Sequence, residues 1–197
     1  MREIYTFIDL ETTGLDYKTE QIIEIAAIKT DLEYEYGRFH TFVRLVEGRD
    51  LPQEITELTG ITANHLRGGI LPGEAVAALD SFAGRDVVVC HNLPFDASFL
   101  GWCGNYDFVC TRALAKLVEP TESASLKDVC ARHDIELTGH HRAMNDVLAT
   151  IEVFRKLKPI ADERGIEYRN VVVNSPDRPL TFVPYNAKVV EVLAHST

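Results

Sequence analysis

The sequence lacks any apolar run long enough to cross a membrane. A membrane-spanning helix needs roughly 20 consecutive apolar residues, and no stretch of this 197-residue chain approaches that length. The N-terminus also lacks a signal-peptide layout, because Glu3 is acidic and Asp9 interrupts the first apolar stretch. We therefore expect no membrane contact and a cytoplasmic location.

Paired cysteines are also missing. The four cysteines show neither C-x-x-C pairs nor the spacing of a zinc site, and they are Cys90, Cys103, Cys110 and Cys130. This pattern excludes a disulfide scaffold and a structural zinc module. We expect free, buried thiols in a reducing compartment.

A basic stripe is the third absence. The net charge is −10, whereas proteins that bind duplex DNA broadly carry clustered Lys and Arg. This excludes non-specific tracking along a DNA groove. It leaves open an enzyme that holds only the end of a strand through metal ions, because clustered carboxylates facing divalent cations nearly cancel in charge. The remaining composition, 46% apolar without repeats, is typical of a globular domain.

Apolar periodicity divides the chain into a first part rich in strands and a second part rich in helices. We predict an antiparallel meander of three strands, followed by helices that alternate with short strands. The predicted strands are 5–10, 21–30, 34–46, 86–90, 106–109 and 168–174, with 188–193 as strand or helix. The predicted helices are 52–58, 63–66, 72–82, 95–102, 111–118, 125–133 and 142–157. Lys158-Pro159 is expected to end the last helix, and the pattern as a whole indicates an α/β fold with a mixed sheet.

Two carboxylates lie at the end of the first predicted strand. Residues two apart in a strand point to the same face, so Asp9 and Glu11 should project together from its end. Paired carboxylates usually need a counter-cation, and Mg²⁺ or Mn²⁺ prefers such oxygen ligands. For this pair alone, a solvated acidic turn is the simpler interpretation.

Asp96 lies near the start of a helix that follows the strand 86–90. Ligand sites in α/β sheets gather at such strand-to-helix junctions. An Asp near a helix N-terminus is also a common choice for capping or for the helix dipole. Asp96 alone therefore does not identify a site.

Asp146 lies one turn into the helix 142–157, beside its apolar stripe. A carboxylate at a buried edge needs a partner or a cation. His141 is five residues earlier, in the loop or first turn after Gly139, from which it could reach the same site. His140 is the neighbouring alternative, and the spacing favours His141.

Three motifs together resemble the DEDDh-type 3′→5′ exonucleases, a family that includes the proofreading epsilon subunits of bacterial DNA polymerase III. The motifs are Asp9-x-Glu11-Thr12-Thr13-Gly14, His91-Asn92-x-x-Phe95-Asp96-x-x-Phe99-Leu100 and His141-x-x-x-x-Asp146. They occur in the family's order, on the predicted strand, helix start and helix. The resemblance implies a ribonuclease H-like fold, a mixed five-stranded sheet that begins with three antiparallel strands.

The resemblance also implies roles for the five residues. Asp9, Glu11 and Asp146 would hold a first Mg²⁺ or Mn²⁺, and Asp9 with Asp96 would hold a second. Two such metals can clamp the attacking and leaving oxygens of a phosphodiester. His141 would be the general base, because an imidazole with a pKa of about 6.5 can accept a proton from water near neutral pH.

The family pattern further implies a set of substrate contacts. These residues are Thr12, Thr13, Leu15, Leu58, Thr59, Ile61, Asn92 and Phe95. An aromatic side chain such as Phe95 can stack on bases of any sequence. Core packing is the alternative role for Phe95 and Leu15.

The expected function is hydrolysis of single-stranded or frayed DNA 3′ ends to nucleoside 5′-monophosphates, in proofreading, replication or repair. Two alternatives stay open, an exoribonuclease of the same superfamily and a subunit that docks on a polymerase. We expect residues 1–159 to form the exonuclease domain. Residues 160–197 form a C-terminal extension that could cover a sheet edge, bind a replication partner or contact substrate.

Overall fold

The computed structural model of the chain describes residues 2–101 and 106–192. Its centre is a five-stranded sheet with the strand order β3-β2-β1-β4-β5. The strands are β1 (Tyr5–Thr12), β2 (Ile22–Thr30), β3 (Glu35–Phe42), β4 (Val87–Cys90) and β5 (Phe108–Cys110). The first three pair antiparallel, and β4 and β5 continue the sheet in parallel. The sheet is therefore the mixed one that the sequence predicts.

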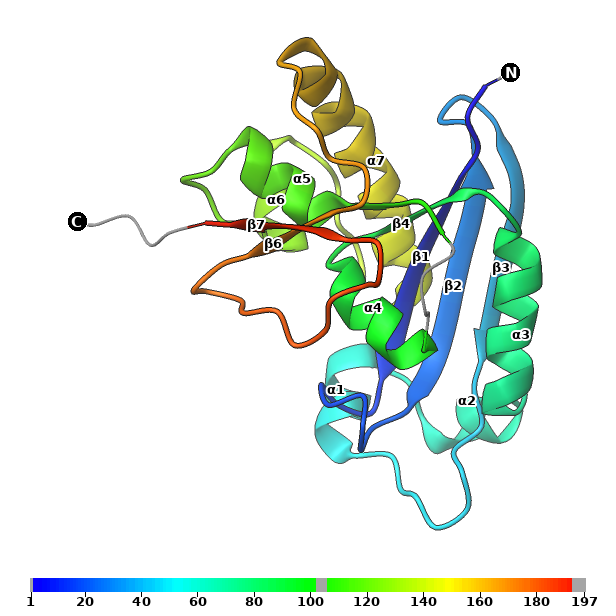
Figure 1. The fold of residues 1–197 in the computed structure, drawn as a ribbon. Helices are drawn as coiled ribbons and strands as arrows, with labels where there is room; N and C mark the ends of the chain where they lie inside the picture. The colour runs from blue at the N-terminus through cyan, green and yellow to red at the C-terminus, as the bar shows by residue number, and fades with distance from the viewer. Residues whose placement is uncertain (1, 102–105, 193–197) are drawn as a thin grey trace.

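Helices cover both faces of this sheet. They are α1 (Gln53–Thr59), α2 (Ala63–Arg67), α3 (Pro72–Ala83), α4 (Leu93–Leu100), α5 (Thr111–Val118), α6 (Leu126–Arg132) and α7 (Ala143–Glu163). Figure 1 shows α3 and α4 on one side of the sheet and α7 on the other. Ser125 caps α6, because its side chain accepts a hydrogen bond from the Asp128 N–H.

The alternation of side chains along β1 builds a core on each face. Tyr5 and Phe7 pack with the buried face of α7, whereas Ile8 and Leu10 pack with α3 and α4. The same alternation turns Asp9 and Glu11 toward the α7 side. The hydrophobic pattern of this strand thus sets the direction in which its carboxylates point.

Helix α7 does not end at Lys158-Pro159 as predicted, but continues to Glu163 with Pro159 inside it. A proline lacks the N–H for one helical hydrogen bond, but Ala161 beyond it is fully buried in the core. The turn that follows the helix passes through Gly165, whose φ is 64°. The Ile166 N–H donates to the Ala161 carbonyl at 2.9 Å, a bond typical of a glycine-terminated helix. Burial of the last turn therefore outweighs the missing proline N–H.

Other predicted boundaries also differ from the structure, and two of these differences have a clear local cause. Helix α4 begins at Leu93 rather than at residue 95, because Asn92 adopts a left-handed conformation and Pro94 fits the first turn. Strand β3 ends at Phe42 rather than at residue 46, because the chain then pairs with a different segment. The Ile70 carbonyl accepts the Arg44 N–H at 2.8 Å.

The cysteines match their prediction where the structure describes them. Cys90, Cys110 and Cys130 are free and buried. Cys103, Trp102 and Leu193, which belong to predictions above, lie outside the described residues. No helix within residues 2–101 and 106–192 is long and apolar enough to cross a membrane.

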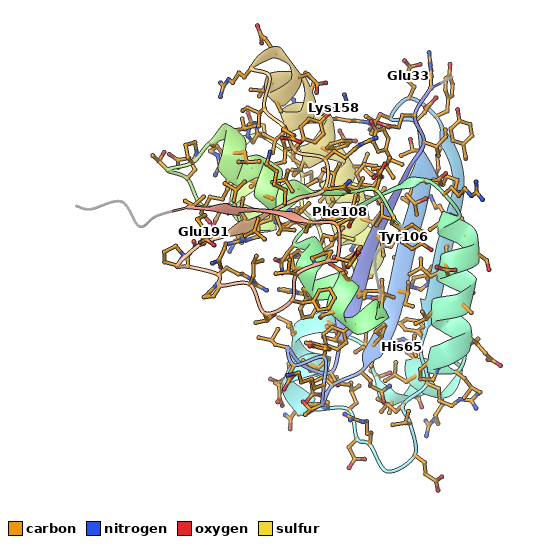
Figure 2. All side chains as sticks on the ribbon, in the orientation of Figure 1. Glu33, His65, Tyr106, Phe108, Lys158 and Glu191 are labelled. Atoms are coloured by element: carbon orange, nitrogen blue, oxygen red, sulfur yellow. The ribbon has the colours of Figure 1, made fainter. Side chains whose placement is uncertain are left out.

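The C-terminal segment forms a small second sheet of two parallel strands, β6 (Val171–Asn174) and β7 (Lys188–Glu191). It is tied to β5 at Phe108, which Figure 2 labels: the Asn170 N–H donates to the Phe108 carbonyl at 2.8 Å. Val172 and Val173 are buried in the core cluster on the α3 and α4 side. The predicted segment 188–193 is thus a strand over Lys188–Glu191. The domain division at residue 159 stays a prediction.

Candidate active site

The structure brings the four predicted carboxylates to one end of the sheet. Asp9 and Glu11 come from β1, Asp96 from the first turn of α4 and Asp146 from the first turn of α7. Oxygen atoms of Asp9, Glu11 and Asp146 all lie within 4.8 Å of one another. Glu11, Asp96 and Asp146 are each less than 10% exposed. The cluster is therefore a set of hard oxygen ligands at a distance that suits a shared divalent cation.

Burial and mutual repulsion perturb these carboxylates. Burial raises the pKa of Asp9 well above its usual range, and the charges of Asp96 and Asp146 raise it further. Burial likewise raises the pKa of Glu11 to about 8, with Asp146 and Glu24 adding to the effect. Burial also raises the pKa of Asp96, against hydrogen bonds from the backbone. Such a cluster is favourable only when protons or cations offset its charge.

Both neighbouring histidines face Asp146. The ring of His140 lies 2.8 Å from Asp146 Oδ1 through Nδ1, and the backbone N–H of His141 donates to Asp146 Oδ2 at 3.1 Å. The two rings stack with centroids 3.9 Å apart. Burial and the neighbouring His140 lower the pKa of His141, and Asp146 opposes them. Within residues 2–101 and 106–192, the ring of His141 makes no hydrogen bond, whereas that of His140 is engaged.

Glu24 fixes the start of α7, and the sequence reasoning did not identify it. It lies opposite Glu11 in the sheet register and accepts hydrogen bonds from Arg142 Nη2 at 3.0 Å and from the Ala143 N–H at 3.1 Å. His40 Nε2 lies 2.8 Å away. Burial would raise the pKa of Glu24, but hydrogen bonds from Arg142, His40 and Ala143 lower it. Glu24 thus holds the turn of α7 that carries Asp146.

The carboxylates open into a pocket of about 690 Å³. Six of the eight predicted substrate contacts line it, and these are Thr12, Leu15, Leu58, Thr59, Asn92 and Phe95. Thr13 is outside the lining, and its hydroxyl donates to Glu20 at 2.6 Å. Ile61 is fully buried with Ile23 and Leu66. For these two residues, substrate contact stays a prediction that their positions do not support.

The pocket also holds residues that the sequence reasoning did not assign, among them His91, Arg112, Lys127 and Arg178. His91 was visible beside Asn92 in the second motif. Its Nε2 donates to the Ala124 carbonyl at 3.0 Å, and its Nδ1 lies 3.0 Å from the Thr111 hydroxyl oxygen. These contacts give His91 a structural role in the pocket wall. Lys127 and Arg178 carry no local sequence signal, because only the folded chain brings them to the site.

A mixed sheet with clustered carboxylates at the end of its central strand defines a ribonuclease H-like nuclease fold. Comparison with known proteins agrees. The family model described as "Exonuclease" matches residues 6–154. The chain belongs to this exonuclease family.

Curated relatives and a solved structure carry the same likeness. The chain is 30% identical over 203 residues to the PolC-type DNA polymerase III of Bacillus subtilis strain 168, covering 96% of the chain but 14% of that much longer protein. It is 32% identical to the DNA polymerase III epsilon subunit of Aquifex aeolicus, covering 78% of the chain and 79% of that protein. Escherichia coli exonuclease I with a dT13 oligonucleotide superposes with a TM-score of 0.71 at 19% identity, over 83% of this chain and 42% of that one.

Proposed function

We propose that the chain is a divalent-metal-dependent 3′→5′ exonuclease that hydrolyses single-stranded or frayed DNA ends to nucleoside 5′-monophosphates. The observation that carries this proposal is the buried trio Asp9, Glu11 and Asp146, with oxygens within 4.8 Å, at the bottom of an open pocket. The exonuclease family model and the polymerase relatives support the reaction class. The DNA oligonucleotide in the complex of exonuclease I supports the choice of substrate.

The carboxylates fit a divalent cation because they are hard oxygen donors that repel one another when no cation is bound. Asp9, Glu11 and Asp146 would hold one Mg²⁺ or Mn²⁺, and Asp9 with Asp96 would hold a second. When bound, such cations supply positive charge that stabilises the phosphate and the leaving 3′-oxygen. The carboxylates would thereby determine where the scissile phosphate lies.

His141 is the proposed general base. Its pKa is lowered by burial and by His140, which keeps the imidazole neutral at neutral pH and able to accept a proton from the attacking water. Its ring is also the one of the pair that does not bind Asp146. His140, whose Nδ1 lies 2.8 Å from that carboxylate, would instead orient Asp146.

The terminal nucleotide would rest between β1 and α1. Leu15 and Leu58 are 79% and 51% exposed at the pocket. Contiguous exposed apolar surface marks ligand-binding grooves, and flat bases would suit these two leucines. Phe95, whose ring lies 5.0 Å from that of Phe99, offers a stacking surface deeper in the pocket. Apolar and stacking contacts of this kind would not distinguish one base from another, as expected of an enzyme that shortens strands of any sequence.

The two histidine variants test the mechanism directly. We expect His141→Ala to lower kcat on single-stranded DNA about 10²–10⁴-fold, the usual contribution of a positioned general base, with metal binding retained. The matched variant His140→Ala should lower kcat far less. Stopped assays with labelled DNA measure kcat, and calorimetric Mn²⁺ titration measures metal binding.

Wild-type turnover by His141→Ala would remove that residue from the mechanism. A large loss confined to His140→Ala would assign the base to the neighbouring ring. Parallel assays on RNA show whether the enzyme prefers ribose or deoxyribose substrates. Turnover of RNA far above that of DNA would favour the exoribonuclease alternative.

We further propose a setting in DNA replication or repair, since relatives are named as DNA polymerase III proteins. In that setting the chain would remove 3′-terminal nucleotides beside a polymerase. Co-elution of the chain with a replicative polymerase on a sizing column tests this association, and separate elution would contradict stable docking.

A further inference from the structure

One wall of the pocket comes from the C-terminal segment. Asp177 and Arg178, in the loop between β6 and β7, line the same pocket as the carboxylates. They lie beyond residues 6–154, which the exonuclease family model matches. The C-terminal extension therefore reaches the site, and this loop carries no assigned role.

The loop is held in place by a buried arginine. Arg112, in the first turn of α5, is 6% exposed. Its Nη2 donates to Ser175 Oγ and to Asp177 Oδ2, both at 3.2 Å. The Arg178 N–H donates to the Ser175 carbonyl at 3.0 Å and closes a turn. The backbone of Arg178 is therefore fixed relative to the catalytic domain, without using its side chain.

Arg178 and Lys127 both line the pocket as unpaired cations. Both residues are exposed pocket-lining residues. Within residues 2–101 and 106–192, neither guanidinium nor ammonium makes a hydrogen bond or an ion pair. Lys127 comes from α6 and Arg178 from the C-terminal loop, so two elements far apart in sequence present positive charge to one cavity. Most other surface arginines of this chain are paired with carboxylates.

The pocket lining carries charges of both signs. The carboxylates of β1, α4 and α7 are its acidic part, and Lys127 of α6 and Arg178 of the C-terminal loop add positive charge that no carboxylate among the described residues pairs, whereas Asp177 of the same loop is bound by Arg112. The chain as a whole is acidic, with a net charge of −10. Unpaired cations in its pocket would attract an anionic ligand that is long enough to reach past the carboxylate cluster. A nucleic-acid strand is such an anion, because each nucleotide upstream of the cleaved bond adds one phosphate.

We propose that Arg178 and Lys127 form a subsite that binds backbone phosphates of the substrate strand upstream of the scissile bond. This inference rests on the proposed exonuclease function. The subsite holds the strand in register while the carboxylates act on its last phosphodiester. It contributes to affinity for long strands and leaves the chemical step unchanged.

Two substrates separate the subsite from the catalytic centre. The p-nitrophenyl ester of thymidine 5′-monophosphate has one phosphodiester and no upstream phosphate, whereas a long oligothymidylate has many. We expect Arg178→Ala and Lys127→Ala each to raise KM for the oligothymidylate about threefold to tenfold, with kcat unchanged. Hydrolysis of the small ester should stay at the wild-type level.

Arg85→Ala is the matched control, because Arg85 is exposed and precedes the opposite end of β4. It should leave KM unchanged, and Arg178→Lys should restore part of the lost affinity. Each lost phosphate contact should also reduce the slope of log KM against log salt concentration by about 0.7. A general structural defect would instead impair hydrolysis of both substrates and would leave the salt slope unchanged.

If the wild-type enzyme is active but the double variant Arg178→Ala/Lys127→Ala keeps its KM and salt slope, the proposed subsite is wrong and the proposed exonuclease function stands. An equal loss on both substrates would place these residues in the catalytic step and also overturn the subsite. If the wild-type chain hydrolyses neither substrate with Mn²⁺, the proposed function fails, and the subsite fails with it.

Discussion

At the scale of single residues, the site is a balance of buried charges. Glu24 is as buried as the clustered carboxylates of the candidate site, but hydrogen bonds from Arg142, His40 and the Ala143 N–H offset its charge. Glu11, its partner across the sheet, has no comparable set of donors among the residues that the structure describes, and burial raises its pKa to about 8. The difference between two paired glutamates thus separates a structural anchor from a residue suited to hold metal.

His91 provides a pH-dependent prediction. Burial lowers its pKa to about 3, and the charges of Arg112 and Arg178 contribute. In the unfolded chain a histidine has a pKa of about 6.5. Below pH 6.5 the unfolded state therefore takes up a proton that the folded state refuses, and this group makes stability fall as pH decreases toward 3. The loss is at most about 1.4 kcal/mol per pH unit.

We expect the free energy of unfolding of His91→Gln to depend less on pH than that of the wild type, because glutamine does not titrate. Urea unfolding of both proteins at several values between pH 7.5 and pH 5 measures the free energy of unfolding. The difference in free energy of unfolding between the wild type and His91→Gln should become smaller as pH falls. Parallel profiles over this range would show that His91 does not titrate differently in the folded state.

The core of the site was predictable from the sequence because its residues lie in short motifs with fixed geometry. Asp9 and Glu11 share a face by strand alternation, and the structure places their oxygens together with that of Asp146. Glu24 and Arg178 were not predictable in this way. Their roles depend on sheet register and on a loop from the far end of the chain, neither of which leaves a local pattern.

At the scale of elements, the C-terminal end of α7 shows packing overriding local preference. Proline predicts a helix end, but the fully buried Ala161 continues the core beyond Pro159. Gly165, with a φ of 64°, supplies the actual end. The meander and the alternating second half were predictable by periodicity, because their apolar faces repeat at regular intervals. Boundaries were not, since they depend on which turn is buried.

Gly165 and Gly73 form a matched pair for this claim. A Cβ at either position would meet nothing within 4 Å, but only Gly165 has a positive φ. We expect Gly165→Ala to lower the free energy of unfolding by about 1–2 kcal/mol, the cost of a left-handed residue with a side chain. Gly73→Ala, inside α3, should be neutral or stabilising by up to about 1 kcal/mol.

Chemical denaturation of both variants, without metal, measures the two changes. Equal effects at the two positions would contradict a helix end fixed by the backbone conformation of Gly165.

At the scale of the whole molecule, an acidic chain presents its candidate metal ligands and two unpaired cations in one pocket. The net charge of −10 disfavours contact with nucleic acid over most of the surface. The pocket combines carboxylates suited to divalent cations with the unpaired Lys127 and Arg178. This distribution suits an enzyme that engages the end of a strand and releases the duplex behind it. It also explains how an exonuclease can function without a basic stripe.

The central claim is metal-dependent hydrolysis from the 3′ end, and digestion of end-labelled single-stranded DNA tests it most directly. The same strand is labelled at either end and incubated with Mg²⁺, Mn²⁺ or chelator, with Asp146→Asn as the inactive control. We predict stepwise shortening of the 5′-labelled strand and early release of the 3′ label as a mononucleotide, both abolished by chelator. Shortening from the 5′ end, internal cleavage, or activity that persists in chelator would contradict the claim.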